Sequence, residues 1–192
     1  MKKDNMYEVY KDYLLEVNSH TNLTTITDPD EIQVKHFEDS LSVLDYISQG
    51  DRVLDIGSGA GFPGIPLRIE KDFDLTLIDS VNKKVTFMNE VIDKLTLENT
   101  RAIHTRAEDY AKENREKFDV VVSRAVANMS TLSELCIPFL KVGGIFIAMK
   151  GPKADEELEE AQKALKILGG EVIKLERFTL DGNERVNIIV KK

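Results

Sequence analysis

A chain of 192 residues with 42% hydrophobic and 31% charged residues has the composition of a globular protein that can bury a sizeable core in one domain, residues 1–192. No apolar stretch approaches the ~20 residues of a membrane span, and the N-terminus lacks the apolar segment of a secretory signal, so we expect a cytoplasmic protein without a membrane partner. The formal net charge of −8 argues against a strong non-specific grip on nucleic acid, and the single cysteine excludes an intrachain disulfide and a cysteine-cluster metal site.

The N-terminal part of the chain is predicted to be helical. Tyrosines and aliphatic residues recur at helical spacing over residues 4–18, which predicts an amphipathic helix. Asp28, followed by a proline and an acidic residue, has the pattern of a helix cap, and that helix is expected to run to about Ile47. We therefore expect an N-terminal helical region, 1–50, in front of a catalytic α/β core, 51–192.

A glycine-rich loop follows the first predicted strand, residues 52–56. The glycines are Gly57, Gly59 and Gly61, and Pro63 is expected in the first turn of the next helix. A strand, a glycine-rich turn and a helix start form a place where a ligand can contact backbone. The positive end of that helix is expected to favour a ligand carboxylate.

The spacing within this loop indicates the ligand. The dinucleotide fingerprint needs Gly or Ala at the sixth position from Gly57, where this chain has Phe62, so a nicotinamide dehydrogenase is disfavoured. The pattern G-x-G-x-G preceded by Asp55 resembles motif I of methyltransferases that use S-adenosylmethionine. Asp79 ends the next predicted strand 22 positions after Gly57, close to the ~20-residue spacing at which a carboxylate reaches a ribose hydroxyl.

Strands and helices are predicted to alternate from residue 52 onward. Strands are expected at 52–56, 74–79, 100–104, 118–123, 144–149, 171–178 and 185–190, and helices at 63–71, 82–95, 129–137 and 154–168. This alternation predicts a mostly parallel sheet with helices on both faces. The loop 181–183 predicts a hairpin, so the last two strands should be antiparallel. Gly57, Asp79, Glu108 and Arg124 follow strand ends and should converge on one sheet edge, where such sheets bind ligands.

At this point the chain resembles the bacterial small-subunit ribosomal RNA guanine-N7 methyltransferases, the glucose-inhibited division protein B family. The resemblance is carried, in the family's order, by NLT at 22–24, KHFEDS at 35–40, DIGSGAGFPGIP at 55–66, DS at 79–80, KK at 83–84, RAE at 106–108, SRAVA at 123–127 and KG at 150–151. KHFEDS and SRAVA are more specific than the glycine loop, because generic methyltransferases lack them. The resemblance implies a seven-stranded Rossmann-like methyltransferase fold with a terminal antiparallel hairpin and a short N-terminal helical extension.

The cofactor implied by this resemblance is S-adenosylmethionine, with S-adenosylhomocysteine as product and no metal. The residues expected to bind it are Asp55, Gly57, Gly59, Phe62, Asp79, Ser80, Ala107, Glu108 and Arg124. We expect loop backbone to contact the methionine portion, Asp79 to hold the ribose hydroxyls, and Ala107 and Glu108 to frame the adenine. Phe62 is equally well interpreted as a core residue, and Glu108 as a solvated turn acid.

The acceptor chemistry implied by the family needs no general base. Guanine N7 is an unprotonated lone pair, so catalysis is mainly positioning, and Arg124 is the catalytic candidate for that role. Arg124 is alternatively a contact to phosphate, guanine O6 or the cofactor carboxylate, or a surface ion pair. The chain has no Asn-Pro-Pro-Tyr or Asp-Pro-Pro-Tyr motif after the fourth strand and no Pro-Cys motif, and Cys136 is expected in the core.

The expected partner is 16S rRNA in the small ribosomal subunit, bound by a protein that we expect to be a monomer. The target guanine should lie in a loop or be flipped out, since the major groove of A-form RNA is deep and narrow. Candidate RNA-contacting residues are Lys35, His36, Asp39 and Lys150, although a lone histidine is more often structural. The alternatives are a methyltransferase for a small molecule or protein, and a non-catalytic cofactor-binding and RNA-binding module.

Overall fold

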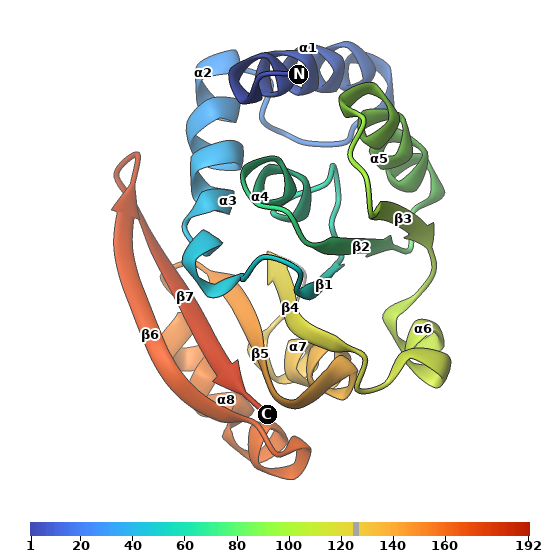
Figure 1. Ribbon diagram of the computed structural model, residues 1–192. Coiled ribbons are helices and arrows are strands. Elements are labelled where there is room, and N and C mark those ends of the chain that lie inside the picture. The colour runs from blue at the N-terminus through green and yellow to red at the C-terminus, as the bar shows by residue number, and fades with distance from the viewer. Residues whose placement is uncertain (125–126) are drawn as a thin grey trace.

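Seven strands form one mixed sheet in the computed structural model, which describes residues 1–124 and 127–192 (Figure 1). The strands are β1 (Arg52–Ile56), β2 (Asp74–Asp79), β3 (Thr100–His104), β4 (Phe118–Arg124), β5 (Leu140–Lys150), β6 (Glu171–Leu180) and β7 (Asn183–Lys191). The spatial order is β3-β2-β1-β4-β5-β7-β6. β1 to β5 are parallel, whereas β7 lies antiparallel between β5 and β6. The mostly parallel sheet and its terminal hairpin are therefore confirmed.

Helices cover both faces of this sheet. They are α1 (Lys3–Thr21), α2 (Pro29–Ile32), the π-helix η1 (Gln33–Glu38), α3 (Asp39–Leu41), the 3₁₀ turn η2 (Leu44–Tyr46), α4 (Gly64–Glu70), α5 (Asn82–Leu95), α6 (Ala107–Asn114), α7 (Met129–Cys136), the 3₁₀ turn η3 (Ile137–Phe139) and α8 (Ala154–Leu168). The sequence did not predict α6, half of whose residues are charged and which buries only Ala107. A single buried residue gives the segment no apolar face that a sequence pattern would reveal.

Successive strand residues divide the hydrophobic core into two parts, as the alternation of side chains along a strand requires. Val53 and Val120 belong to the core beneath α1, α4 and α5, together with Tyr10 and Phe37. Their neighbours Leu54 and Val121 belong to the core beneath α7 and α8. Both faces are covered, so the functional groups at the strand ends are the ones left accessible.

The segment from Asp28 to Ile47 is helical in its first part but not one regular helix. The Asp28 carboxylate caps it, accepting from the backbone N–H of Asp30 at 2.9 Å and of Glu31 at 3.0 Å. The expected cap is confirmed, but η1 interrupts the α-helical pattern and regular helix ends at Leu41. A π-turn adds a residue to the repeat, which places both His36 and Phe37 in the buried interior.

The hairpin between β6 and β7 turns through Asp181 and Gly182. Both residues have positive φ, 48° and 72°, as two-residue hairpin turns of this kind require. The long hairpin rises along α2 and α3 in Figure 1, and its tip contacts the N-terminal region through an ion pair from Lys35 to Asp181 (3.4 Å). The last strand therefore lies next to the first fifty residues.

Helix α1 supports the glycine-rich loop through a buried tyrosine. The Tyr10 hydroxyl donates to the Ala60 carbonyl at 2.5 Å, and its ring stacks on Phe62. A Cβ added to Gly61, whose φ is +96°, would come within 2.7 Å of that hydroxyl. The glycine thus permits the close approach of α1.

Replacing Tyr10 by phenylalanine is expected to lower the free energy of unfolding by about 1–2 kcal/mol, because the buried Ala60 carbonyl loses its donor. Denaturant titration measures the change. Tyr13→Phe is the matched control on the same helix, since its hydroxyl donates to Glu90 at an exposed site, and it should cost less than about 0.5 kcal/mol. Equal losses in the two variants would contradict this account of Tyr10.

Pro63 lies immediately before α4 and not within its first turn, as the prediction had it. The loop before it turns back on itself, since the Phe62 N–H donates to the Ser58 carbonyl at 2.9 Å.

None of the helices in the described part of the chain combines the length and the apolar character that crossing a bilayer requires.

Candidate functional site

Two cavities open at the carboxyl ends of the parallel strands. One, of about 400 Å³, lies over the ends of β1, β2 and β3 and the start of α6, and we call it the β1–β3 cavity. The other, of about 600 Å³, lies between η1 and the ends of β4, β5 and β7, and we call it the β4–β7 cavity. The first is lined by five of the predicted cofactor residues: Gly57, Asp79, Ser80, Ala107 and Glu108. The second is lined by Arg124 and all four predicted RNA-contacting residues: Lys35, His36, Asp39 and Lys150.

Asp79 holds the glycine loop against the end of β2. Its carboxylate accepts from the Gly59 N–H at 3.0 Å and from the Val81 N–H at 2.9 Å, and Lys84 Nζ lies 3.9 Å away. Each oxygen accepts one backbone N–H and keeps capacity for a further donor. The carboxylate therefore faces the β1–β3 cavity in a form that can accept from two hydroxyls of a diol.

The glycine loop exposes backbone to open space. Gly57 and Gly59 have φ of 71° and 61°, in the left-handed region that glycine adopts most easily. A Cβ added to Gly59 would meet no atom of the described residues within 4 Å. The loop backbone thus has room beside it for a ligand.

Asp55 is fully buried and lines neither cavity. Its Oδ2 accepts from the Gly64 N–H at 2.8 Å, and Gly64 has no room for a Cβ beside that oxygen. The start of α4 is therefore occupied by this chain's own carboxylate, and the expectation of a free helix end for a ligand was wrong. Burial raises the pKa of Asp55 to about 7, against the opposing effect of the hydrogen bond from Gly64. Its other oxygen has no hydrogen-bond partner among the described residues.

Phe62 lies in the core, at 4% exposure, and lines neither cavity. Its ring is stacked between Tyr10, at 5.3 Å, and His36, at 4.4 Å. The guanidinium of Arg124 lies over the same ring at 5.2 Å. Of the two interpretations that the sequence left open, the core residue describes its position.

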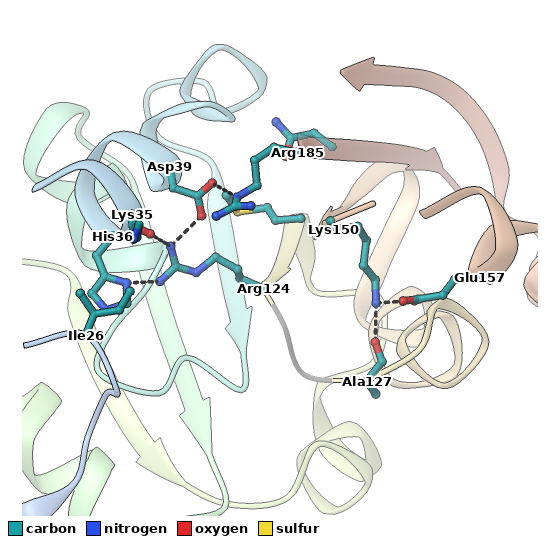
Figure 2. A pocket seen from close by; sticks show the side chains of 12 residues that line it. Ile26, Lys35, His36, Asp39, Arg124, Ala127, Lys150, Glu157 and Arg185 are labelled. Carbon is teal, nitrogen blue, oxygen red and sulfur yellow. Dashed lines mark hydrogen bonds and ion pairs between the residues drawn. The ribbon is translucent and has the colours of Figure 1, made fainter. Parts of the chain in front are cut away.

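Arg124, at the end of β4, joins the N-terminal region to the sheet (Figure 2). Its Nη1 donates to Asp39 Oδ2 at 2.9 Å and to the Lys35 carbonyl at 3.2 Å, and its Nη2 donates to His36 Nδ1 at 3.1 Å. With Phe62 beneath it, the guanidinium is held from several sides. This fixed geometry suits a positioning group and excludes the loose surface ion pair.

His36 is held as one neutral tautomer. Arg124 can only donate, so His36 Nδ1 accepts, and Nε2 carries the proton that it donates to Thr24 Oγ1 at 2.9 Å. Burial, together with the Arg124 charge, lowers the pKa of His36 to about 3. Because both ring nitrogens are occupied within the protein, His36 is not available as a general base.

The buried neutral state of His36 predicts acid sensitivity. An unfolded histidine has a pKa of about 6.5, so between pH 6.5 and 3 the unfolded chain binds more protons than the folded one and stability falls as pH falls. Between pH 8 and pH 5 this group should lower the free energy of unfolding by about 2 kcal/mol, a loss that His36→Gln removes. Denaturant titrations at both pH values measure it. His20→Gln, at the exposed end of α1, should keep the wild-type loss, and a wild-type loss in His36→Gln would contradict the assignment.

The two predicted RNA-contacting lysines are engaged within the protein. Lys35 pairs with Glu31 at 2.5 Å and Asp181 at 3.4 Å. Lys150 is buried and pairs with Glu157 at 2.7 Å. Both lysines line the β4–β7 cavity, but each would have to exchange a carboxylate for a ligand.

Arg185 is a cavity residue that the sequence analysis missed. It lies on β7, and its Nε donates to Asp39 Oδ1 at 3.1 Å. Two residues further on, the buried Asn187 donates to Ser42 Oγ at 3.1 Å. Arg185 and Asn187 alternate with apolar residues at the start of the segment 185–190, and this was the signal available in the sequence.

The remaining predicted positions divide between core and undescribed chain. Cys136 is fully buried in the core beneath α7, as expected. Ala125 and Val126 of the SRAVA segment lie outside the described residues. Among the residues that are described, no group of three or more His, Cys, Asp or Glu side chains is placed to hold a metal ion.

Comparison with known proteins places this geometry among methyltransferases. A family model described as "GidB: rRNA small subunit methyltransferase G" matches residues 3–186. The chain is 48% identical to ribosomal RNA small subunit methyltransferase G of Lactobacillus helveticus, covering all of this chain and 83% of the relative. It is 51% identical to the protein of the same name from Lachnoclostridium phytofermentans, covering 97% of this chain and 80% of the relative.

Solved structures share the fold at low sequence identity. The crystal structure of M. jannaschii TYW2 in complex with AdoMet superposes with a TM-score of 0.68 at 18% identity, covering 82% of this chain and 76% of that one. P. horikoshii TYW2 in complex with MeSAdo also gives 0.68, at 14% identity, covering 81% of this chain and 62% of that one. The chain thus spans less than two thirds of the second structure, and both likenesses concern the fold alone.

Proposed function

We infer the function of this chain from the GidB family, rRNA small subunit methyltransferase G, to which it belongs over residues 3–186. The chain is a class I S-adenosylmethionine-dependent methyltransferase that methylates N7 of a guanine in 16S rRNA. What its own residues contribute to that reaction follows from the two cavities at the sheet edge.

We propose that the β1–β3 cavity holds the adenosine portion of the methyl donor. S-adenosylmethionine supplies an electrophilic methyl group on a sulfonium. Asp79 accepts from the ribose hydroxyls, a free diol being the partner that a carboxylate suits. Ala107 and Glu108, at the start of α6, border the adenine, and the open backbone at Gly57 and Gly59 borders the methionine portion.

The acceptor guanine then belongs in the β4–β7 cavity, and the charge of that cavity is the observation that carries the proposal. Four cations, Lys35, Arg124, Lys150 and Arg185, line it against two carboxylates, Asp39 and Glu157. Lys35 and Lys150 have carboxylate partners of their own, but Arg124 and Arg185 share the single carboxylate of Asp39, so a positive excess remains in a chain whose net charge is −8. A basic site on an acidic protein suits one phosphate-bearing substrate without favouring non-specific binding of nucleic acid.

The residues of this cavity act by positioning and not by proton transfer. Guanine N7 carries no proton, so no base is needed, and His36 has no free nitrogen to act as one. Arg124 keeps its guanidinium fixed between Asp39 and His36. With S-adenosylmethionine bound, these residues would hold the guanine so that its N7 lone pair lies in line with the donor's methyl group.

A methyl-transfer assay tests the proposed function. Purified protein is incubated with S-adenosylmethionine labelled in the methyl group and with small subunits that lack the modification. Label is expected in 16S rRNA, in a guanosine that becomes sensitive to the borohydride and aniline cleavage typical of N7-methylguanosine. Donor binding without label in RNA, or label only in protein or small molecules, would overturn the proposal.

We further propose that the protein works in the cytoplasm as a monomer. Both cavities are lined within one chain, so a second copy is not needed to complete them. Sedimentation at assay concentration should give the mass of one chain, 21.7 kDa. A dimer of twice that mass would contradict this part of the proposal.

A further inference from the structure

Arg185 lies at the mouth of the β4–β7 cavity, on the strand that forms its far wall. Two of its three guanidinium nitrogens are held in place, since Nε donates to Asp39 Oδ1 at 3.1 Å and Nη1 donates to the Glu184 carbonyl at 3.2 Å. Its Nη2 has no partner among the residues that the structure describes, and the side chain is 26% exposed. Nη2, at the outer end of the guanidinium, is therefore available to a ligand.

Asp39 is shared between two arginines. Arg124 bonds to one of its oxygens and Arg185 to the other, and the carboxylate itself is buried (Figure 2). Two guanidinium groups against one carboxylate leave one unit of positive charge. A single phosphate diester, with one negative charge, is the ligand that balances this trio.

Arg185 is the member of the trio that can bind it. Both terminal nitrogens of Arg124 already donate within the protein, to Asp39, Lys35 and His36. The other two cations of the cavity, Lys35 and Lys150, have carboxylate partners of their own. Arg185 shares its carboxylate partner with Arg124, and its Nη2 has no partner among the described residues.

We propose that Arg185 binds a backbone phosphate of the RNA strand that carries the target guanine, and that Asp39 fixes the guanidinium for this contact. The inference rests on the proposed function, because it names how that same cavity holds its RNA. Phosphate contacts set the register of a nucleic acid on a protein, and a planar guanidinium offers paired donors to phosphate oxygens. Arg185 thereby aligns the strand while Arg124 stays free of that task.

The test compares Arg185→Gln with Arg177→Gln. Arg177 lies on the neighbouring strand β6, one register position away, and pairs with Asp155 and Glu184 outside the cavity. Methylation of unmodified small subunits is measured over a series of salt concentrations. In Arg185→Gln the KM for the RNA substrate should rise about tenfold and the salt slope of log kcat/KM should fall by about 0.7, the value for one phosphate contact on a single strand. The kcat, the Kd for S-adenosylmethionine and every parameter of Arg177→Gln should stay within about twofold.

Other outcomes assign the residue differently. A fall in kcat with unchanged KM and salt slope would mean that Arg185 only positions Arg124 through Asp39, and it would overturn the proposal. Equal KM changes in Arg177→Gln would show a general charge effect and would do the same. Inactivity of the wild-type protein on every RNA would instead overturn the proposed function.

Arg185→Lys keeps the test open if Arg185→Gln fails to fold. Lysine retains the charge but lacks the planar pair of donors, so the wild-type salt slope should persist while KM rises less than tenfold. A reduced slope in Arg185→Lys would contradict the phosphate contact.

Discussion

Gly59→Val is expected to abolish measurable binding of S-adenosylmethionine, with a loss of affinity of at least about 100-fold. The φ of +61° at Gly59 is strained for a β-branched residue. The new side chain would also fill the open space beside the loop, where the methionine portion of the donor is proposed to lie. Titration calorimetry with the donor measures the loss, and methylation should fall with it.

The matched control for this variant is Gly50→Val. Gly50 has a similar φ, +81°, and also meets no atom of the described residues within 4 Å, but it precedes β1 at the opposite edge of the sheet. It should suffer the same backbone strain and keep donor affinity within about twofold. Normal affinity in Gly59→Val would show that the loop does not contact the donor. A comparable loss in Gly50→Val would mean that strain alone explains the effect.

Arg124→Ala is expected to reduce kcat/KM for methylation by about 100-fold to 1000-fold while the protein stays folded. The variant removes the guanidinium that joins β4 to η1 and leaves His36 Nδ1 without its donor. Asp39 keeps Arg185 as a partner, so its buried charge is not left alone. Single-turnover methylation gives the rate, and thermal unfolding reports the fold.

Arg101→Ala serves as the control for loss of an arginine from the same sheet. Arg101 lies on β3, donates to Thr76 and lines neither cavity of the functional edge. Its methylation rate should stay within about twofold of wild type. Arg124→Ala with the wild-type rate would remove Arg124 from the site, whereas unfolding at assay temperature would assign it to stability.

The strands and most helices were predictable because their signals are local. Apolar runs with intervening helical patterns located β1 to β4 to within a residue, and the Asp-Gly pair at 181–182 located the hairpin. β5 was predicted to begin at residue 144 but begins at Leu140, because Gly143 and Gly144 interrupt its apolar run. Leu140 pairs with Phe118 of β4, and the pairing resumes at Ile145 opposite Val120 after a shift of register across the glycines.

The π-helical turn η1 was beyond local prediction. Its six residues have an ordinary helical pattern, and the wider turn is justified only by what it buries, the His36 ring against Phe62 and the Phe37 ring near Tyr10. Such contacts exist only after α1 and the glycine loop have packed together. The energetic reason for the turn is thus tertiary.

The site shows the same division between local and non-local signals. Gly57 follows β1, and Asp79 and Arg124 are the last residues of β2 and β4; strand ends can be located from one segment at a time. Arg185 entered the site through Asp39, which is 146 positions earlier in the chain. No sequence pattern around Asp39 or around Arg185 predicts that the two side chains pair. Asp55 was predicted to bind the cofactor, whereas in the structure its carboxylate accepts from the backbone N–H of Gly64 at the start of α4.

The position of β7 between β5 and β6 determines when the sheet can be completed during synthesis. Synthesis delivers the five parallel strands first, and they can pair in the order in which they leave the ribosome. β7, made after all of them, fills the place beside β5 and brings Arg185 and Asn187 to Asp39 and Ser42 in the N-terminal helical region. The strands that border the proposed donor cavity are therefore made before the strand that completes the proposed acceptor cavity. A growing chain has no finished acceptor cavity until β7 has left the ribosome.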